Sequence, residues 1–290
     1  MTAADEPPAA AVASAPSPPS PLRARASSAL ASVSSAAALA LALLLLVAAC
    51  GGGAALSAFD AAAALASALA VLAWYAACVA WLLPQPWARG DARARSWLIS
   101  LLVSAVMTAA SLPTFSAVLA SDDAGFVALT HAETPFTRGA SIFFAVATAL
   151  DLAVGRAEYP RELGLVSGYV HHLAFVALAY LPLTTRSCSA FVALCVAELP
   201  TLVLALGSVV PALRSDVGFG ASFFLLRVCF TSAALAWYWR LATLRYVVAT
   251  TAFSVLLNAV FFVNWVRGMM RRRQRRQGAD DEAGAAGKAA

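Results

Sequence analysis

The chain has 290 residues; 61% of them are hydrophobic, only 12% are charged, and the formal net charge is +5. A soluble globular domain carries about 25% charged residues, so this composition excludes a protein whose whole surface faces water. It indicates a polytopic membrane protein.

Residues 1–27 are rich in Ala, Pro and Ser and hold too few large apolar side chains to build a core. They therefore predict a disordered tail. The Ala/Ser/Arg bias leaves an organellar transit peptide, and with it a plastid membrane, as an alternative, although Asp5 and Glu6 argue against it. The stretch "LLLLVAACGGG", which contains Cys50, resembles a bacterial lipoprotein signal, but the many apolar spans that follow argue against lipidation.

Hydropathy predicts about eight transmembrane helices separated by polar or turn-forming pieces, and therefore an all-α fold. The predicted spans are 29–50, 61–83, 97–119, 139–154, 164–183, 188–210, 218–239 and 246–266.

The arginines test this number of spans. With eight spans both termini share one side of the membrane, which receives about fourteen arginines, whereas the other side receives four. Because cytosolic loops carry an excess of Lys and Arg, we expect both termini in the cytosol. Seven spans would place the cluster "RGMMRRRQRR" (267–276) opposite the arginines of 89–95, and we reject that arrangement. The cluster fits a stop-transfer signal; contact with anionic lipid head groups and a receptor-read retention signal are the alternatives.

Several chemistries lack the residues that they need. The only lysine, Lys288, lies in the tail, which excludes a retinal Schiff base, and three histidines are too few for the di-iron boxes of membrane desaturases. Five cysteines without CxxC spacing predict neither a zinc site nor a disulfide framework. No Walker or GxGxxG motif is present, so we expect no bound cofactor, no metal and no nucleic acid.

Five ionisable residues lie inside the predicted spans: Asp151, His171, His172, Glu198 and Arg227. A charged group among lipid tails costs about 2.5–3.5 kcal/mol or more unless it faces the protein interior. A rise of about 1.5 Å per residue places His171, His172, Glu198 and Arg227 about 10–19 Å from the cytosolic ends of their helices. It places Asp151 about 5 Å from the cytosolic end of its helix. The five residues therefore predict a polar pocket in the cytosolic half of the bundle.

Neighbouring residues on a helix point about 100° apart, so we expect His171 and His172 to have different partners. One is expected to face Glu198, and the other to face a substrate or Asp151. A neutral imidazole beside a carboxylate can act as a general base. Pro200 removes a backbone amide donor and is expected to open its helix.

The same residues, with Asn258 as a lesser member, also have a purely structural interpretation. Intramembrane His, Glu, Asp and Arg can hold helices together without any chemistry. The residues by themselves leave open this interhelical role and a lipid-binding or catalytic pocket.

The chain resembles the TLC domain family in five stretches. In chain order they are "SWLISLLVSAVMTAASL", "FFAVATALDLAVG", "VSGYVHHLAFVALAYL", "FVALCVAELPTLVLAL" and "GASFFLLRVCF". That family includes the ceramide synthases, the translocating-chain-associated membrane proteins and smaller TLC-domain proteins. The double histidine His171–His172, Glu198 on the next helix and Arg227 carry the resemblance, and Asp151 matches an acidic residue on the helix before the histidines. The resemblance covers about residues 95–268 and implies a six-helix barrel with the histidines inside.

Ceramide-synthase chemistry, if it carries over, implies acyl transfer from acyl-CoA, as co-substrate, to a sphingoid-base amine. His171 or His172 would be the base or transient acyl carrier, with Asp151, Glu198 and Arg227 as substrate-binding residues. The chain departs from the ceramide synthases in "AELPTL", where they carry His-Asp and a further Asp, and in its first TLC helix, which has no histidine. "ELPT" is more similar to the smaller TLC-domain proteins, which are linked to membrane lipid composition and trafficking.

The sequence thus predicts a disordered tail (1–27), two N-terminal transmembrane helices (28–94), a TLC domain (95–268) and a basic, then polar, cytosolic tail (269–290). We expect a protein of lipid homeostasis in the endoplasmic reticulum or another endomembrane, which binds, senses or moves a lipid. Membrane lipids are the expected partners, and a homo-oligomer is left open. An acyl-CoA-dependent N-acyltransferase and a non-catalytic cargo or translocation accessory protein are the alternatives.

Overall fold

The computed structural model describes residues 57–241 and 245–289. The predicted tail over 1–27 and the predicted span over 29–50 lie outside these residues. The described part of the chain is helical and contains no strand, which confirms the predicted all-α class.

The helices have the following bounds, with η marking π-helical or 3-10 stretches. They are α2 (Ala58–Ala77), η1 (Cys78–Leu82), α3 (Ala92–Arg95), α4 (Leu98–Ala120), α5 (Asp123–Thr130), α6 (Pro135–Glu158), η2 (Leu165–Val170), α7 (His171–Thr185), α8 (Cys188–Leu194), η3 (Cys195–Glu198), α9 (Leu199–Val209), η4 (Pro211–Leu213), α10 (Asp216–Ser222), η5 (Phe223–Phe230), α11 (Thr231–Arg240) and α12 (Arg245–Ala289).

Six helices of the described part are long and apolar enough to cross a membrane. They are Ala58–Leu82, Ala92–Ala120, Pro135–Glu158, Cys188–Val209, Asp216–Arg240 and Arg245–Arg272. The predicted span over 164–183 is helical, as η2 and α7, but is not among these six. The class of the protein, a helical membrane protein, agrees with its composition.

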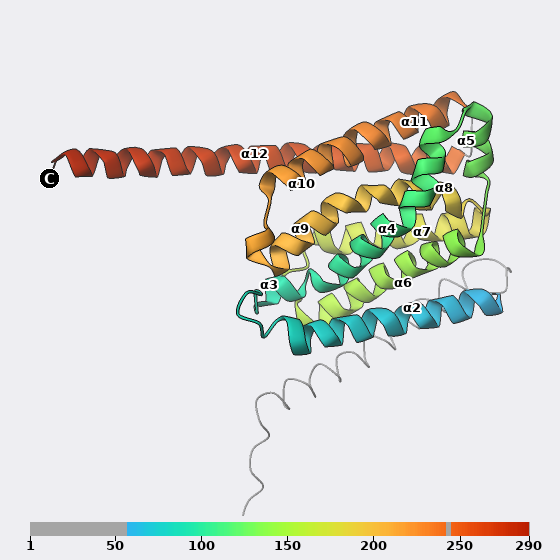
Figure 1. The fold of residues 1–290 in the computed structure, drawn as a ribbon, viewed down its shortest axis with the longest axis horizontal. Helices are drawn as coiled ribbons and strands as arrows, with labels where there is room; N and C mark the ends of the chain where they lie inside the picture. Colours follow the sequence, from blue (N-terminus) through green and yellow to red (C-terminus); the bar gives the residue numbers. More distant parts are fainter. Residues whose placement is uncertain (1–56, 242–244, 290) are drawn as a thin grey trace, which may run out of the picture.

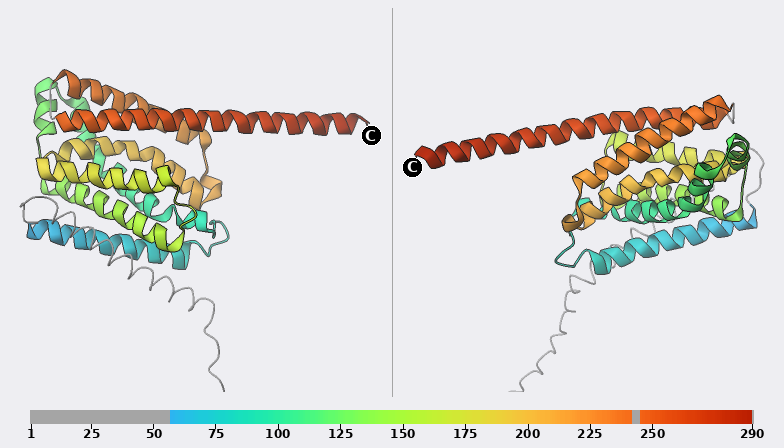
Figure 2. Two further views of the ribbon diagram at one scale, coloured as in Figure 1. Left: turned by 180° about the vertical axis from the view of Figure 1, so that it is seen from behind. Right: turned by 45° about the horizontal axis from the view of Figure 1, so that its top comes forward.

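The helices lie side by side in a bundle (Figures 1 and 2). Helix α2 runs along α6 at one side, α11 and α12 pair at the opposite side, and α4, α7, α8 and α9 lie between them. Helix α6 is the most enclosed of the six. In its apolar stretch of 18 residues 72% is buried inside the bundle, whereas only 17% of the corresponding stretch of α12 is buried. Helix α12 continues well beyond the bundle (Figure 1).

Local sequence explains where two of these helices begin. Ser57 and Asp60 form a capping box at the start of α2, in which each side chain accepts a hydrogen bond from the other residue's backbone amide. Thr134 and Thr137 do the same at α6, where Pro135 occupies the first turn.

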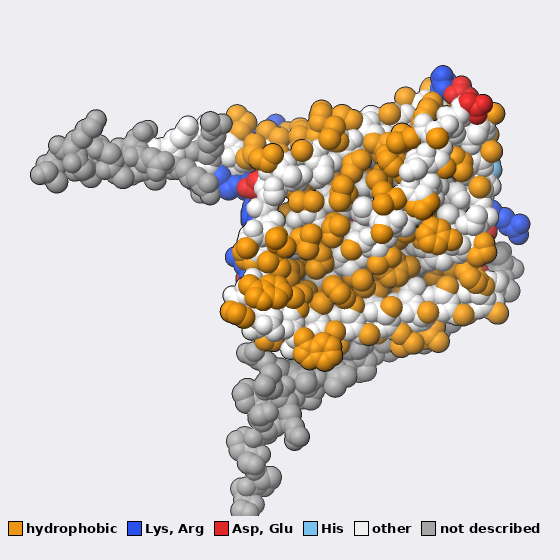
Figure 3. Space-filling view, viewed as in Figure 1, with side chains coloured by type: hydrophobic (Ala, Val, Ile, Leu, Met, Phe, Trp, Pro, Cys, Tyr) orange, Lys and Arg blue, Asp and Glu red, His pale blue; other side chains and the backbone are white. Residues whose placement is uncertain are grey.

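Apolar side chains cover the flank of the bundle, and charged side chains gather at its two ends (Figure 3). Three connecting segments meet at one end: 83–97, 156–164 and 207–216. The Arg89 amide donates to the Val209 carbonyl at 2.9 Å, and Arg95 lies 3.9 Å from Glu158. We call these three segments the arginine-rich end.

Candidate functional site

A cavity of about 460 Å³ lies inside the bundle, and we call it the main cavity. Residues of α4, α6, α7, α9, η5 and α12 line it. The five ionisable residues singled out from the sequence all lie on its wall: Asp151, His171, His172, Glu198 and Arg227. The fold therefore brings together residues from four separate helical segments.

Asp151 on α6 is the centre of one polar group in this wall. The Ser100 hydroxyl donates to its Oδ2 at 2.9 Å, the Tyr159 hydroxyl donates to its Oδ1 at 2.9 Å, and His172 Nε2 lies 3.2 Å from Oδ2. The carboxylate is buried, yet each of its oxygens has a partner. Burial, and then the charge of Asp151, raises the pKa of the Tyr159 phenol well above its ordinary value, so the phenol stays protonated and continues to donate.

The second contact of His172 decides where its hydrogens lie. Its Nδ1 is 2.7 Å from the carbonyl oxygen of Gly168. A carbonyl oxygen can only accept, so Nδ1 carries a hydrogen. Because Nε2 then faces a carboxylate oxygen, a further proton must lie between Nε2 and Asp151 for the two to be hydrogen-bonded. The Gly168 carbonyl thus fixes the orientation of the imidazole, and Nε2 points at Asp151 in the wall of the main cavity.

Arg227 on η5 is the centre of the other polar group. Its Nε donates to the Ala197 carbonyl at 2.7 Å, and its Nη2 donates to Glu198 Oε1 at 3.0 Å and to Thr201 Oγ1 at 2.6 Å. All three acceptors belong to the stretch around Pro200, where 3-10 helix η3 ends and α9 begins. Pro200 lies between these acceptors, but the helix over Cys188–Val209 is continuous and only tightens to a 3-10 stretch over Cys195–Glu198.

His171 differs from its neighbour. Its ring packs against Phe175, with 4.5 Å between the ring centroids, and lies 5.6 Å from the ring of His172. Its Nδ1 is buried and has no hydrogen-bond partner among the described residues. Of the two contacts expected for the histidines, the structure has the one to Asp151, made by His172, while Glu198 is paired with Arg227.

A second cavity, of about 100 Å³, adjoins the main cavity. The two share six wall residues: Phe144, His171, Phe175, Glu198, Arg227 and Phe261. The remaining wall of the second cavity comes from α7, α8, η3, α11 and α12. His171 and the Arg227–Glu198 pair therefore stand at the junction of the two spaces.

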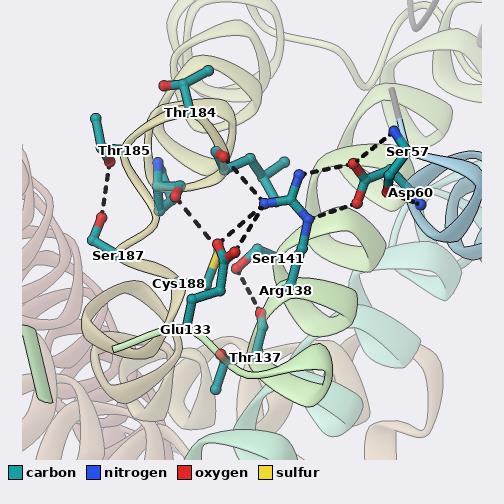
Figure 4. A network of polar contacts seen from close by, with 12 residues as sticks. Ser57, Asp60, Glu133, Thr137, Arg138, Ser141, Thr184, Thr185, Ser187 and Cys188 are labelled. Atoms are coloured by element: carbon teal, nitrogen blue, oxygen red, sulfur yellow. Dashed lines mark hydrogen bonds and ion pairs between the residues drawn. The ribbon is translucent and has the colours of Figure 1, made fainter. Parts of the chain in front are cut away.

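A separate polar network lies at the end of the bundle opposite the arginine-rich end (Figure 4). Arg138 donates to both oxygens of Asp60, at 2.6 and 2.8 Å, to Glu133 at 3.1 Å and to the Leu183 carbonyl at 3.2 Å. The Cys188 thiol donates to Glu133 at 3.2 Å. The guanidinium is occupied by these partners, so the network joins α2 to α6, α7 and the start of α8.

Sequence reasoning missed several of these residues. Ser100, Tyr159 and Thr201 touch the ionisable groups directly, but hydroxyl residues are too common in membrane helices to attract notice singly. Asp60 and Arg138 lie near helix ends, where a charge is unexceptional. Within the described residues no group of three or more His, Cys, Asp or Glu side chains is arranged to hold a metal ion.

Comparisons of the chain with family models, with curated proteins and with solved structures find no match. The fold and the site are those of a helical protein with six helices long and apolar enough to cross a membrane, and with two groups of polar side chains in the wall of a cavity inside its bundle.

Proposed function

We propose that the chain is a TLC-type membrane protein of lipid homeostasis, which holds a lipid in the main cavity. In this proposal the chain has eight spans, the last six of which form the TLC bundle, and both termini lie in the cytosol. The protein resides in the endoplasmic reticulum or another endomembrane, where it binds, senses or moves its lipid.

The wall of the main cavity, which combines ionisable and aromatic side chains, carries this proposal. The Asp151–His172 and Glu198–Arg227 pairs lie on the same wall as a set of phenylalanines: Phe144, Phe175, Phe219, Phe223 and Phe261. A lipid has the same two parts, a polar group and an apolar chain. The volume, about 460 Å³, lies within the range of about 300–1,000 Å³ that is typical of small-molecule sites.

Filling the cavity tests the proposal. Leu204 lines the main cavity, so Leu204→Trp is expected to reduce the lipid that co-purifies with the detergent-solubilised protein several-fold, as measured by mass spectrometry of the extracted lipid. Leu69→Trp is the matched control, because Leu69 is 60% exposed on the outer face of α2. Equal lipid content in the two variants would place the lipid on the outer surface and contradict the proposal.

His171 favours a second candidate, an acyl-CoA-dependent N-acyltransferase. Its buried Nδ1 has no partner within the described residues and its ring lines both cavities, so this nitrogen is free to accept a proton or an acyl group from a substrate. Microsomes with wild type or a folded His171→Ala variant would receive labelled acyl-CoA and a sphingoid base. Product formed only by wild type supports this chemistry, and equal background in both excludes it for that acceptor.

A further inference from the structure

The mostly apolar wall of the second cavity contains a stripe of polar side chains that the proposed function does not use. Thr251, Ser254 and Asn258 of α12 line it. Their spacing of three and four residues places them on one face of the helix. The neighbouring Phe253, Leu256 and Val260 are exposed on the flank of the bundle. Helix α12 therefore turns a polar stripe inward and an apolar face outward.

Thr251 of this stripe has a buried hydroxyl without a partner among the described residues. It is only 3% exposed, and its Oγ1 is buried with no hydrogen-bond partner among the described residues. Two other threonines of the same wall behave differently: Thr231 donates to the Arg227 carbonyl at 2.6 Å, and Thr250 to the Val247 carbonyl at 3.1 Å. A buried hydroxyl normally finds a partner, so the free Thr251 hydroxyl indicates a group that occupies the cavity.

The charges around this space indicate what kind of group it is. Glu198 and Arg227, which stand at the junction of the cavities, neutralise each other. The polar side chains deeper in the second cavity are uncharged: hydroxyls, and the amide of Asn258, which is 9% exposed. A charged ligand group there would be buried without a counter-ion, which is unfavourable, whereas an uncharged donor and acceptor would satisfy the hydroxyl and the amide.

The size of the space limits the group further. The second cavity, of about 100 Å³, is less than a quarter of the volume of the main cavity, so it has room for a small polar group and not for a whole lipid.

We propose that the second cavity binds the uncharged, hydroxyl-bearing polar group of a lipid, with Thr251 and Asn258 as its hydrogen-bond partners. The apolar part of this lipid lies along the phenylalanines of the main cavity. This inference rests on the proposed function, because it names the class of lipid that the same pair of cavities takes: neutral alcohols in preference to lipids with a charged head group.

Two probes that differ by one group test the inference: photoactivatable diacylglycerol and photoactivatable phosphatidic acid with the same acyl chains. The full-length protein in phosphatidylcholine vesicles is expected to capture diacylglycerol several-fold more than phosphatidic acid, with the label mapped to α12 near Thr251. Thr251→Val keeps the shape but removes the hydroxyl, so it is expected to lower diacylglycerol capture about two- to tenfold, as the loss of one hydrogen bond does.

Thr108→Val is the matched control. Thr108 Oγ1 is also buried without a partner among the described residues, but Thr108 lines neither cavity. Its substitution is expected to leave capture unchanged. Without lipid, Thr251→Val is expected to unfold at or above the wild-type temperature, because it removes a hydroxyl that no described residue binds.

Each other outcome overturns the inference. If phosphatidic acid is captured as well as diacylglycerol, or if Thr251→Val captures as wild type does, the proposed function stands and the neutral-lipid site does not. A lower unfolding temperature of lipid-free Thr251→Val would show that the hydroxyl is held within the chain. If wild type captures neither lipid, the neutral-lipid site is overturned, and the lipid content of Leu204→Trp against wild type then decides the proposed function by itself.

Discussion

Arg227 donates to three acceptors that one short stretch of helix supplies: the Ala197 carbonyl, Glu198 and Thr201. Its side chain is 11% exposed and that of Glu198 is 13% exposed. Each charge is stable inside an apolar bundle only because the other is present, since an isolated ion there would lose its hydration without compensation.

Arg227→Met should therefore be more harmful than the double change Arg227→Met/Glu198→Gln. The single change leaves Glu198 as an unpaired buried charge and is expected to lower the free energy of unfolding by about 3 kcal/mol. The double change removes that charge as well and is expected to recover about 1 kcal/mol or more of the loss. Denaturant unfolding in detergent micelles measures both. A double variant no more stable than the single one would contradict the role given to the pair.

At the scale of the helices, α2 is held to the rest of the bundle by its apolar face and by the Asp60–Arg138 contact (Figure 4). Val71 and Tyr75 of α2 are buried in the core, so the helix packs as part of the same bundle as α4 and α6. The network adds a partly buried ion pair, which is worth more than a solvated one because water screens it less.

Asp60→Ala is expected to increase hydrogen exchange in the first turns of α2 and to leave exchange around the main cavity unchanged. Arg138 keeps Glu133 and the Leu183 carbonyl, so the loss stays local. Asp123→Ala is the control: it breaks the Arg240–Asp123 pair, whose side chains are 58% and 56% exposed, and such pairs contribute about 0–1 kcal/mol. Equal effects of the two substitutions would show that the network does not hold α2.

Close helix contact also depends on Gly220. A Cβ atom at this position would lie 2.3 Å from Cη2 of Trp265, so α10 and α12 can approach only because the side chain is absent. Gly220→Ala is expected to push the two helices apart and to lower the thermal unfolding temperature. Gly139→Ala is the matched control, because its Cβ would meet Phe59 at 3.9 Å, an ordinary contact. That change is expected to be neutral or to stabilise α6 by about 0.5–1 kcal/mol. A Gly220→Ala variant as stable as Gly139→Ala would contradict this packing.

At the scale of the whole molecule, the two ends of the bundle differ in charge. The arginine-rich end carries six arginines and four acids, whereas the opposite end carries four arginines and four acids. The six arginines are Arg89, Arg93, Arg95, Arg156, Arg161 and Arg214, and the four are Arg138, Arg186, Arg240 and Arg245. An excess of arginine marks the cytosolic side of a membrane protein, so the arginine-rich end should face the cytosol.

Cysteine labelling tests this orientation in sealed microsomes. Gln85 and Asp122 are exposed residues at opposite ends of the bundle. A membrane-impermeant maleimide is expected to label Gln85→Cys directly and Asp122→Cys only after permeabilisation. The reverse pattern would invert the topology.

Local sequence alone predicts an all-helical chain with long apolar helices, and it predicts that Asp151, His171, His172, Glu198 and Arg227 lie inside the bundle; it does not single out Arg93 and Glu162, which also line the main cavity. Each of these predictions follows from a local property. A run of about twenty apolar residues forms a helix in a membrane whatever surrounds it, and a charge within such a run is too costly to face lipid.

Only the tertiary structure decided how those residues pair. The rise per residue predicts how deep a side chain lies, but the rotation of each helix against its neighbours decides which way it points. That rotation turns His172 to Asp151 and leaves the Nδ1 of His171 without a partner in the described chain. It also places the Tyr159 hydroxyl beside Asp151 and Thr251 in the wall of the second cavity. Tyrosine and threonine are common residue types, so the sequence alone does not single these two out.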